Sequence, residues 1–211
     1  MRLYTFFNSS AAYRVRIALN LKGLPYDAVP VHLARGGGEH RRPEFCEVNP
    51  QMRVPALTLA GGETLTQSLA IIEYLEEAFP EPALLPAGGV QRARVRALAQ
   101  IIACDIHPLN NSGTMRYLRE EMGQDQAAIA GWYAHWIVTG FEAIEAMIAP
   151  APYAAGARPG LADICLIPQL YNARRFKVPV ERFTRILSVE AACNRLAAFD
   201  RARPENQPDA E

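Results

Sequence analysis

The chain has 211 residues, 50% of them hydrophobic, and its 22 lysine and arginine residues balance 22 aspartate and glutamate residues. This length and hydrophobic content allow a full buried core in one large domain or two small ones. The balanced charge gives no overall attraction to nucleic acid or to an anionic membrane, so we expect neither as a partner.

The N-terminal residues 1–6 lack the apolar core and cleavage site of a signal peptide, and no apolar run approaches the roughly 18 residues of a membrane span. We therefore expect a cytoplasmic protein that does not enter a membrane. The cysteines are scattered without metal-ligand spacing, which predicts no metal site and small buried hydrophobic side chains in a reducing compartment. They are Cys46, Cys104, Cys165 and Cys193.

The N-terminal part of the chain combines strand and helix patterns. They predict a strand at 2–7, a helix at 10–22, a second strand at 27–33 and a loop at 34–43. A hairpin at 56–59 and 64–66 and a helix at 68–79 follow. A strand–helix–strand order indicates two parallel strands joined by a right-handed crossover. The glycine-rich loop lacks both the ending of a phosphate-binding loop and the spacing of a dinucleotide fingerprint, so it does not predict a nucleotide site.

A proline-rich linker over residues 81–89 separates a domain at 1–80 from a domain at 90–211. Beyond the linker the pattern is entirely helical. The predicted helices cover residues 90–118, 124–148, 161–176 and 189–199. Asp163 stands where a capping box carries its acidic residue, although Gly160 replaces the capping hydroxyl.

The polar stretch Asn8-Ser9-Ser10 lies between the predicted first strand and first helix. The first amides of a helix have no intrahelical acceptor and the macrodipole is positive there, so this junction favours a bound anion such as a thiolate. The alternative is that Ser9 or Ser10 only caps the helix, because serine is a preferred capping residue. From these residues alone both interpretations remain open.

Two further pairs of residues also lie where a predicted strand or helix begins. Val54-Pro55 precedes the hairpin, where a proline must mark a strand start or a special turn because it cannot donate to a sheet. Gln67-Ser68 opens the helix after the hairpin, where the hydroxyl could cap the helix or, with the first amides, receive a carboxylate.

The layout and several motifs resemble those of the glutathione transferases, over essentially the whole chain. Residues 9–19, SSAAYRVRIAL, resemble the zeta-class signature Ser-Ser-Cys-x-Trp-Arg-Val-Arg-Ile-Ala-Leu, and residues 67–77, QSLAIIEYLEE, with 161–163 also resemble that class. Residues 104–111, CDIHPLNN, and 172–176, NARRF, are similar to the maleylpyruvate isomerases in particular. The resemblance implies a thioredoxin-like N-terminal domain that binds glutathione, followed by an all-helical substrate-binding domain.

The resemblance also implies site residues. Ser10, or alternatively Ser9, would hydrogen-bond the glutathione sulfur and lower its pKa. The backbone of Val54, before a cis Pro55, would pair with the cysteinyl part, and Gln67 with Ser68 would hold the γ-glutamyl carboxylate. The residues implied for the glycyl end and the edge of the site are His40, Gln51, His107, Asn111 and Ser112.

The activity that this family implies is reversible addition of the glutathione thiolate to the double bond of a cis dioxo acid. Rotation and elimination then give the trans isomer. Maleylpyruvate or maleylacetoacetate is the expected substrate, within the catabolism of aromatic compounds, and a homodimer is the expected assembly. Asn8, Arg174 and Arg175 are the residues expected near the substrate, because arginine forks suit the two anionic ends of a dicarboxylate.

The chain departs from the isomerase pattern at several positions. Asn8 and Ser112-Gly113 stand where arginines are expected, and Ala11 replaces the zeta-class cysteine. The missing cysteine argues against a reductive dehalogenase that resolves a mixed disulfide. The missing arginines leave two alternatives to the isomerase open: a glutathione-conjugating transferase or lyase that acts on another electrophile, and a glutathione- or ligand-binding protein without catalysis.

Overall fold

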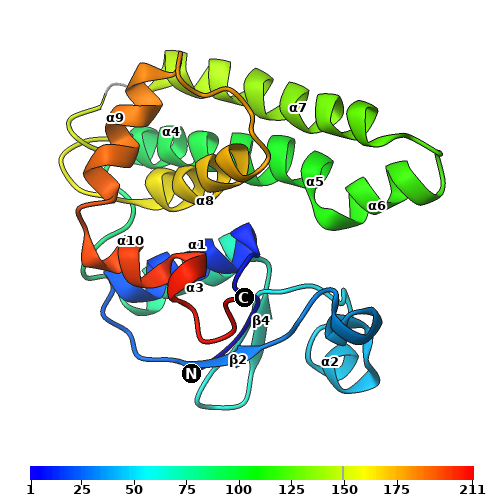
Figure 1. Ribbon diagram of the computed structural model, residues 1–211. Helices are drawn as coiled ribbons and strands as arrows, with labels where there is room; N and C mark the ends of the chain where they lie inside the picture. Colours follow the sequence, from blue (N-terminus) through cyan, green and yellow to red (C-terminus); the bar gives the residue numbers. More distant parts are fainter. Residues whose placement is uncertain (149) are drawn as a thin grey trace. The chain divides into compact units, whose positions relative to one another are not determined.

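The computed structural model describes residues 1–148 and 150–211. Its contacts divide the chain into two compact units (Figure 1). The first unit comprises Met1–Leu84 together with Asn194–Glu211, and the second comprises Leu85–Cys193. The change from the first unit to the second falls within the predicted linker.

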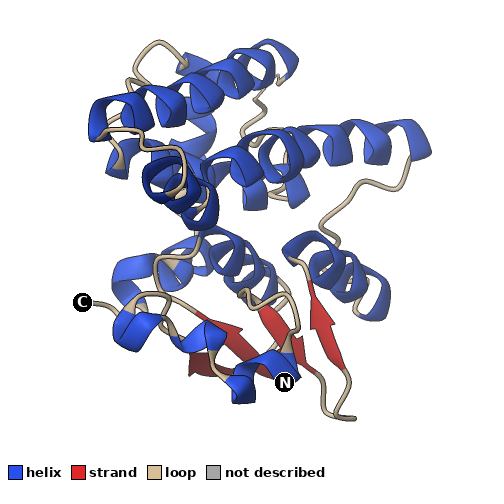
Figure 2. Ribbon diagram, turned by 90° about the vertical axis from the view of Figure 1, so that its right-hand side faces the viewer, coloured by secondary structure: helices blue, strands red, loops and turns tan. Residues whose placement is uncertain are grey.

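The first unit contains a four-stranded mixed sheet, whose strands are red in Figure 2. The strands are β1 (Arg2–Thr5), β2 (Asp27–Pro30), β3 (Ala56–Thr58) and β4 (Thr64–Thr66), in the spatial order β2-β1-β3-β4. β1 pairs with β2 in parallel and with β3 antiparallel, and β3 pairs antiparallel with β4. The predicted parallel pair and the predicted hairpin are both confirmed; β4 has the predicted bounds, and β1, β2 and β3 end earlier than the patterns indicate.

The helices of this unit up to residue 84 are α1 (Ser10–Leu21), α2 (Pro43–Val48) and α3 (Ser68–Ala78). Two predicted helices correspond to α1 and α3, which contact each other on one face of the sheet (Figures 1 and 2). Their apolar rows are buried, including Val15 and Leu19 of α1 and Ile71 and Leu75 of α3. The sequence did not predict α2, because its six residues are too few to show a helical period and its only signal is a proline at the first position.

The C-terminal segment, which we define as Ala197–Glu211, begins with helix α10 (Ala197–Ala202). Asn20 of α1 donates to the Ala198 carbonyl at 3.0 Å, and Arg16 of α1 donates to the Ala202 carbonyl at 3.0 Å. These bonds and the packing of α1 against α10 explain why Asn194–Glu211 groups with the first unit, although the predicted C-terminal domain runs from 90 to 211.

The second unit is helical (Figure 2). Its α-helices are α4 (Gly89–Gln100), α5 (His107–Asn110), α6 (Ser112–Glu120), α7 (Gln126–Met147), α8 (Leu161–Arg175) and α9 (Thr184–Cys193). The prediction of one helix over 90–118 was wrong: the chain passes through a π-helical stretch at Ile101–Ile106, and Asn111 leaves helical geometry to cap α6. The predicted helix at 189–199 is likewise two helices, because Leu196 adopts an extended conformation before α10.

The predicted acidic cap of α8 is confirmed. Asp163 accepts hydrogen bonds from the backbone N–H groups of Gly160, at 2.9 Å, and Ala154, at 2.8 Å. Burial raises the pKa of Asp163 from 3.8 to about 6, against the opposing effect of these hydrogen bonds.

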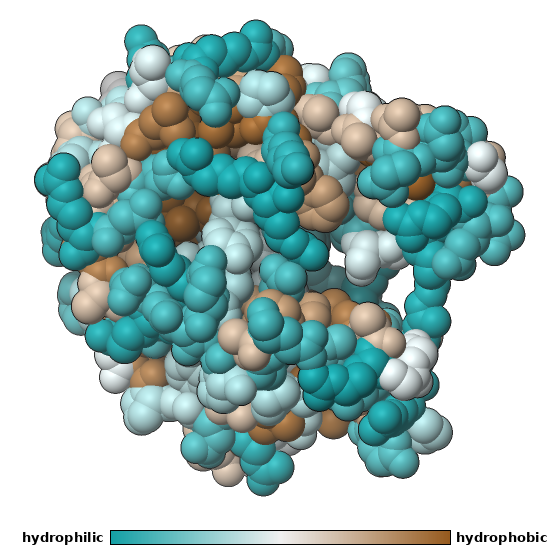
Figure 3. Space-filling view, in the orientation of Figure 1, coloured by the Kyte–Doolittle hydropathy of each residue, from teal (hydrophilic) through white to brown (hydrophobic). Residues whose placement is uncertain are grey.

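Among the described residues, no helix combines the length and apolar character needed to cross a membrane. On the face seen in Figure 3, hydrophilic side chains cover most of the surface and hydrophobic ones form separate patches.

Candidate active site

The serine pair lies at the start of α1, where the sequence predicted it. Ser9 is the N-cap, with extended backbone angles, and its Oγ accepts a hydrogen bond from the Ala12 N–H at 3.2 Å. Ser10 is the first helical residue and only 6% exposed. The capping interpretation is confirmed for Ser9, and Ser10 is a buried residue in the first turn, where the helix dipole is positive. Asn8 lies half-buried in the turn before them.

A second helix in the same unit, α3, also begins with a buried serine. Gln67 precedes α3 in a left-handed conformation with φ 66°, and its side chain does not cap the helix. Ser68 is buried at the first position, and its Oγ accepts a hydrogen bond from Arg14 Nη1 at 3.3 Å. The buried Arg14 guanidinium thus adds a positive charge to the first amides of α3, a combination that favours an anion.

Arg14 is a buried charged residue beside the start of α3, and the sequence did not single it out. It lies on α1, 54 positions before Ser68, and is 1% exposed. The one available signal is an arginine between the apolar residues Tyr13 and Val15 of the first predicted helix, since a cation that is buried needs a polar or anionic partner.

The residues predicted to hold the rest of glutathione surround the hairpin. Val54 is buried, and the expected cis peptide bond between Val54 and Pro55 is confirmed. Gln51 accepts at Oε1 a hydrogen bond of 2.8 Å from Gln67 Nε2, so the structure brings these two predicted side chains together. His40 lies half-buried in a short 3₁₀ turn, Glu39–Arg41, of the glycine-rich loop.

The remaining predicted residues belong to the second unit. Asn111 caps α6: its Oδ1 accepts from the Gly113 and Thr114 N–H groups, at 2.9 and 3.1 Å, and its Nδ2 donates to the Pro108 carbonyl at 2.8 Å. The Asn111 side chain therefore has a structural function that needs no ligand. Ser112 is exposed at the start of α6, and His107 is half-buried at the start of α5.

The two arginines at the end of α8 make different contacts. Arg174 forms a bidentate ion pair with Glu190 of α9, with Nε–Oε1 3.1 Å and Nη2–Oε2 2.6 Å, and this hydrogen-bonded contact raises the pKa of Arg174. The Arg175 guanidinium instead lies over the ring of Phe176, 5.1 Å from its centre. The Phe176 ring packs against Tyr133 with the ring centres 4.0 Å apart. Arg174 is therefore paired with a carboxylate of this chain, whereas the contact found for Arg175 is with an aromatic ring.

A thioredoxin-like sheet unit with serines at two helix N-termini, joined to a helical unit, is the arrangement of the glutathione transferase fold. Family models agree with it: residues 3–83 match the glutathione S-transferase N-terminal domain, and residues 126–201 match the C-terminal domain. The chain belongs to the glutathione S-transferase family, and one solved relative, 50% identical, is described as a zeta-class member.

Several proteins resemble the chain over its whole length. Maleylacetoacetate isomerase of Pseudomonas aeruginosa is 49% identical over 99% of this chain and 98% of its own. A solved structure of the holo form of maleylpyruvate isomerase, a bacterial zeta-class glutathione S-transferase, matches with 50% identity, full coverage of both chains and a TM-score of 0.95. Maleylacetoacetate isomerase from Methylobacterium extorquens, solved with malonate and glutathione, is 35% identical with full coverage and a TM-score of 0.95.

Proposed function

We propose that the protein is a glutathione-dependent cis–trans isomerase of maleylpyruvate, maleylacetoacetate or a related dioxo acid. One observation carries the proposal. Two helices in one unit begin with a buried serine, α1 with Ser10 and α3 with Ser68, and Arg14 of α1 donates a hydrogen bond to the Ser68 hydroxyl. The two suit a thiolate and a carboxylate of the same ligand, and full-length relatives with this fold are named as isomerases of these substrates.

In this proposal glutathione lies along the first unit. The Ser10 hydroxyl donates a hydrogen bond to the sulfur, and the dipole of α1 favours the thiolate. Ser68, Gln67 and the Arg14 charge hold the γ-glutamyl carboxylate, and the Val54 backbone pairs with the cysteinyl part. Support for the cofactor comes from related isomerases solved with bound glutathione.

His40 and Gln51 are proposed for the glycyl end. Gln51 also supports Gln67 through their 2.8 Å hydrogen bond. His107, Asn111 and Ser112 of the helical unit are proposed at the edge of the site, with Asn111 acting through its cap on α6.

The reaction needs no change in redox state. The thiolate adds to one carbon of the cis double bond, forming a C–S bond, and the π electron pair moves onto the conjugated carbonyl as an enolate. The former double bond is now a single bond and rotates. The enolate then re-forms the double bond in the trans geometry and expels the thiolate, so glutathione is regenerated unchanged.

The helical unit is proposed to bind the substrate. Arg175 provides the guanidinium for a substrate carboxylate, whereas Glu190 holds Arg174 beside it. Asn8 is proposed to contact the substrate as a neutral hydrogen-bonding group. A neutral amide attracts a carboxylate less strongly than an arginine does. This chain therefore makes fewer charged contacts with the substrate than a protein that has arginines at the positions of Asn8 and Ser112-Gly113.

The broader setting follows from the family. We propose residues 1–80 as the glutathione-binding domain and 90–211 as the substrate-binding domain, a homodimeric assembly, and a place in the catabolism of aromatic compounds. A cytoplasmic location suits an enzyme that depends on reduced glutathione, because that compartment keeps thiols reduced.

The test follows substrate isomers and glutathione separately. Purified protein is mixed with maleylpyruvate, or with maleylacetoacetate, and a substoichiometric amount of glutathione. Conversion of all the substrate to the trans isomer with glutathione conserved supports the isomerase. Stoichiometric loss of glutathione would instead indicate a conjugating transferase or lyase, and glutathione binding without turnover would indicate a non-catalytic binding protein.

A further inference from the structure

The C-terminal segment reaches the turn that precedes the serine pair. Asp209 accepts a hydrogen bond at Oδ2 from the backbone N–H of Phe7, at 2.9 Å, between residues 202 positions apart. Phe7 lies in the turn between Phe6 and Ser9, which is closed by a bond of 3.0 Å from the Ser9 N–H to the Phe6 carbonyl. A side chain near the end of the chain thus contacts the backbone three residues before Ser10.

Arg16 of α1 holds the same turn from the other side. Its side chain is fully buried. Nη2 donates to the Phe7 carbonyl at 3.0 Å and Nη1 to the Phe6 carbonyl at 3.3 Å, while Nε donates to the Ala202 carbonyl of α10 at 3.0 Å. Both polar groups of the Phe7 backbone are therefore fixed by side chains, its N–H by Asp209 and its carbonyl by Arg16.

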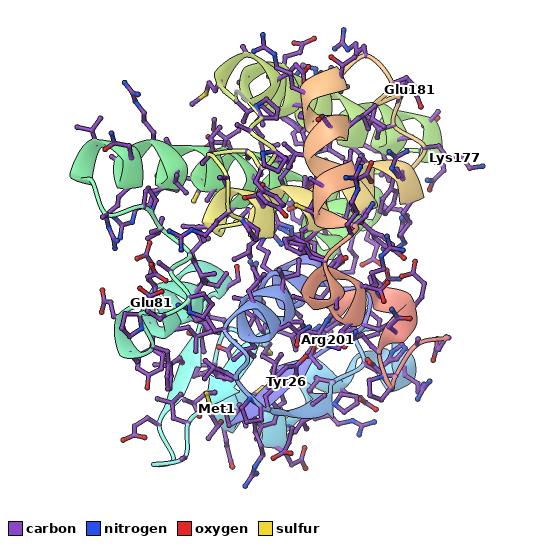
Figure 4. The ribbon with its side chains drawn as sticks, turned by 90° about the vertical axis from the view of Figure 1, so that its left-hand side faces the viewer. Met1, Tyr26, Glu81, Lys177, Glu181 and Arg201 are labelled. Carbon is purple, nitrogen blue, oxygen red and sulfur yellow. The ribbon has the colours of Figure 1, made fainter. Side chains whose placement is uncertain are left out.

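Several ionisable groups lie around this contact, and Arg16 is the fully buried one among them. Burial lowers the pKa of Arg16 to about 10, and the charge of Asp209 opposes that change, as do Tyr26 and Tyr13. Tyr26 also interacts electrostatically with Arg201 of α10, and the two lie close together in Figure 4. Arg16 keeps its positive charge at neutral pH and attracts the Asp209 carboxylate.

Asp209 makes fewer hydrogen bonds than a carboxylate usually requires. Its Oδ1 is buried and has no hydrogen-bond partner among the described residues. A buried carboxylate oxygen without a partner is costly, and such groups in folded proteins call for an explanation beyond local packing. The neighbouring Glu211 differs, because it is exposed and pairs with Arg35 and His32 on the loop.

We propose that Asp209 is a positioning residue which, together with Arg16, fixes the turn Phe6–Ser9 so that the Ser10 hydroxyl stays aligned on the glutathione sulfur. This inference rests on the proposed function, in which Ser10 donates to that sulfur. A hydrogen bond weakens steeply once its angle and distance depart from the optimum, so a small movement of the turn weakens stabilisation of the thiolate. The C-terminal segment therefore adjusts the reactivity of the cofactor without touching it.

The experiment measures the pKa of the glutathione thiol in the binary complex, from the ultraviolet absorbance of the thiolate as a function of pH. Asp209→Ala removes the acceptor for the Phe7 N–H, and we expect it to raise the thiol pKa by about one unit, or tenfold less thiolate at pH values below the pKa. Asp209→Asn keeps an acceptor of the same shape but no charge, and we expect it to restore the wild-type pKa or to lower it slightly. Glu211→Ala is the matched control from the same segment, and we expect no change.

The signs of these shifts separate positioning from a simple effect of charge. If Asp209 acted only through its negative charge, both substitutions would lower the thiol pKa, because a nearby anion disfavours a thiolate. An unchanged or lowered pKa in Asp209→Ala would overturn the inference, as would an equal rise in Glu211→Ala. If Asp209→Ala does not fold, Asp209→Glu is measured instead. The glutamate keeps the negative charge but displaces the acceptor for the Phe7 N–H. An unchanged thiol pKa in Asp209→Glu would also overturn the inference.

The same titration separates this inference from the proposed function. If Ser10→Ala raises the thiol pKa and Asp209→Ala does not, the proposed function stands and the positioning role fails. If wild-type protein does not lower the pKa of bound glutathione below that of free glutathione, the proposed thiolate site fails and the inference fails with it.

Discussion

Removal of the Ser9 hydroxyl should lower the free energy of unfolding and leave the catalytic activity nearly unchanged. The Ser9 Oγ accepts from the Ala12 N–H at 3.2 Å and caps α1. Replacing a capping serine with alanine costs about 1 kcal/mol, within a range of roughly 0.5–2. Because nearly all of α1 from Ser10 to Leu19 is buried, the loss should appear in the unfolding of the first unit. For a chain of this length it corresponds to a fall in Tm of about 2–4 °C.

The assay compares wild type, Ser9→Ala and Ser9→Asn by thermal and urea unfolding, each with and without glutathione. Asparagine is also a preferred capping residue, so Ser9→Asn should keep most of the stability and serves as the matched control. Activity of Ser9→Ala should remain near that of wild type, because Ser10 provides the hydroxyl for the sulfur. Loss of activity in Ser9→Ala with unchanged stability would refute this division and assign the sulfur to Ser9.

Three further predictions concern charged residues. Arg14→Met should raise the Kd for glutathione about tenfold to hundredfold, the equivalent of one charged hydrogen bond, in a calorimetric titration, and an unchanged Kd would remove Arg14 from the site. Arg175→Ala should raise KM for the dioxo acid more than the Kd for glutathione, and more than Arg174→Ala does; the reverse order would assign the substrate to Arg174. The pKa of Asp163 is raised from 3.8 to about 6, so the folded state binds the carboxyl proton more tightly than the unfolded state does. The protonated carboxyl therefore stabilises the fold below about pH 4, and this stabilisation is lost as the pH rises to about 6. Urea unfolding should therefore show wild type losing up to about 3 kcal/mol relative to Asp163→Asn over that range, and a relative gain would contradict the raised pKa.

The sequence predicted best where a local pattern decides the structure. The helical period of α1 and α3 and the hairpin of β3 and β4 each depend on neighbouring residues, and these elements form as expected. The cis bond before Pro55 followed from family resemblance, since no local rule separates it from other prolines.

The sequence predicted least where distant residues decide. The bond from Arg14 to Ser68 spans 54 positions and that from Phe7 to Asp209 spans 202, so no periodicity or motif indicates either. The same holds for Arg174, which appears equivalent to Arg175 in the sequence until Glu190 of α9 pairs with it. The break at Ile101–Ile106 was missed because a π-helical stretch keeps apolar residues at nearly helical spacing.

The central claim is that the Ser10 hydroxyl holds glutathione as the nucleophilic thiolate, and its most direct test is the turnover of Ser10→Ala under saturating glutathione. Removal of one preorganised donor to a reacting anion costs about a hundredfold to a thousandfold in kcat. The account predicts a fall of that order in isomerisation of the dioxo acid, with the Kd for glutathione little changed because Ser68 and Arg14 still bind its carboxylate. A Ser10→Ala protein that isomerises the substrate at the wild-type rate would contradict the claim.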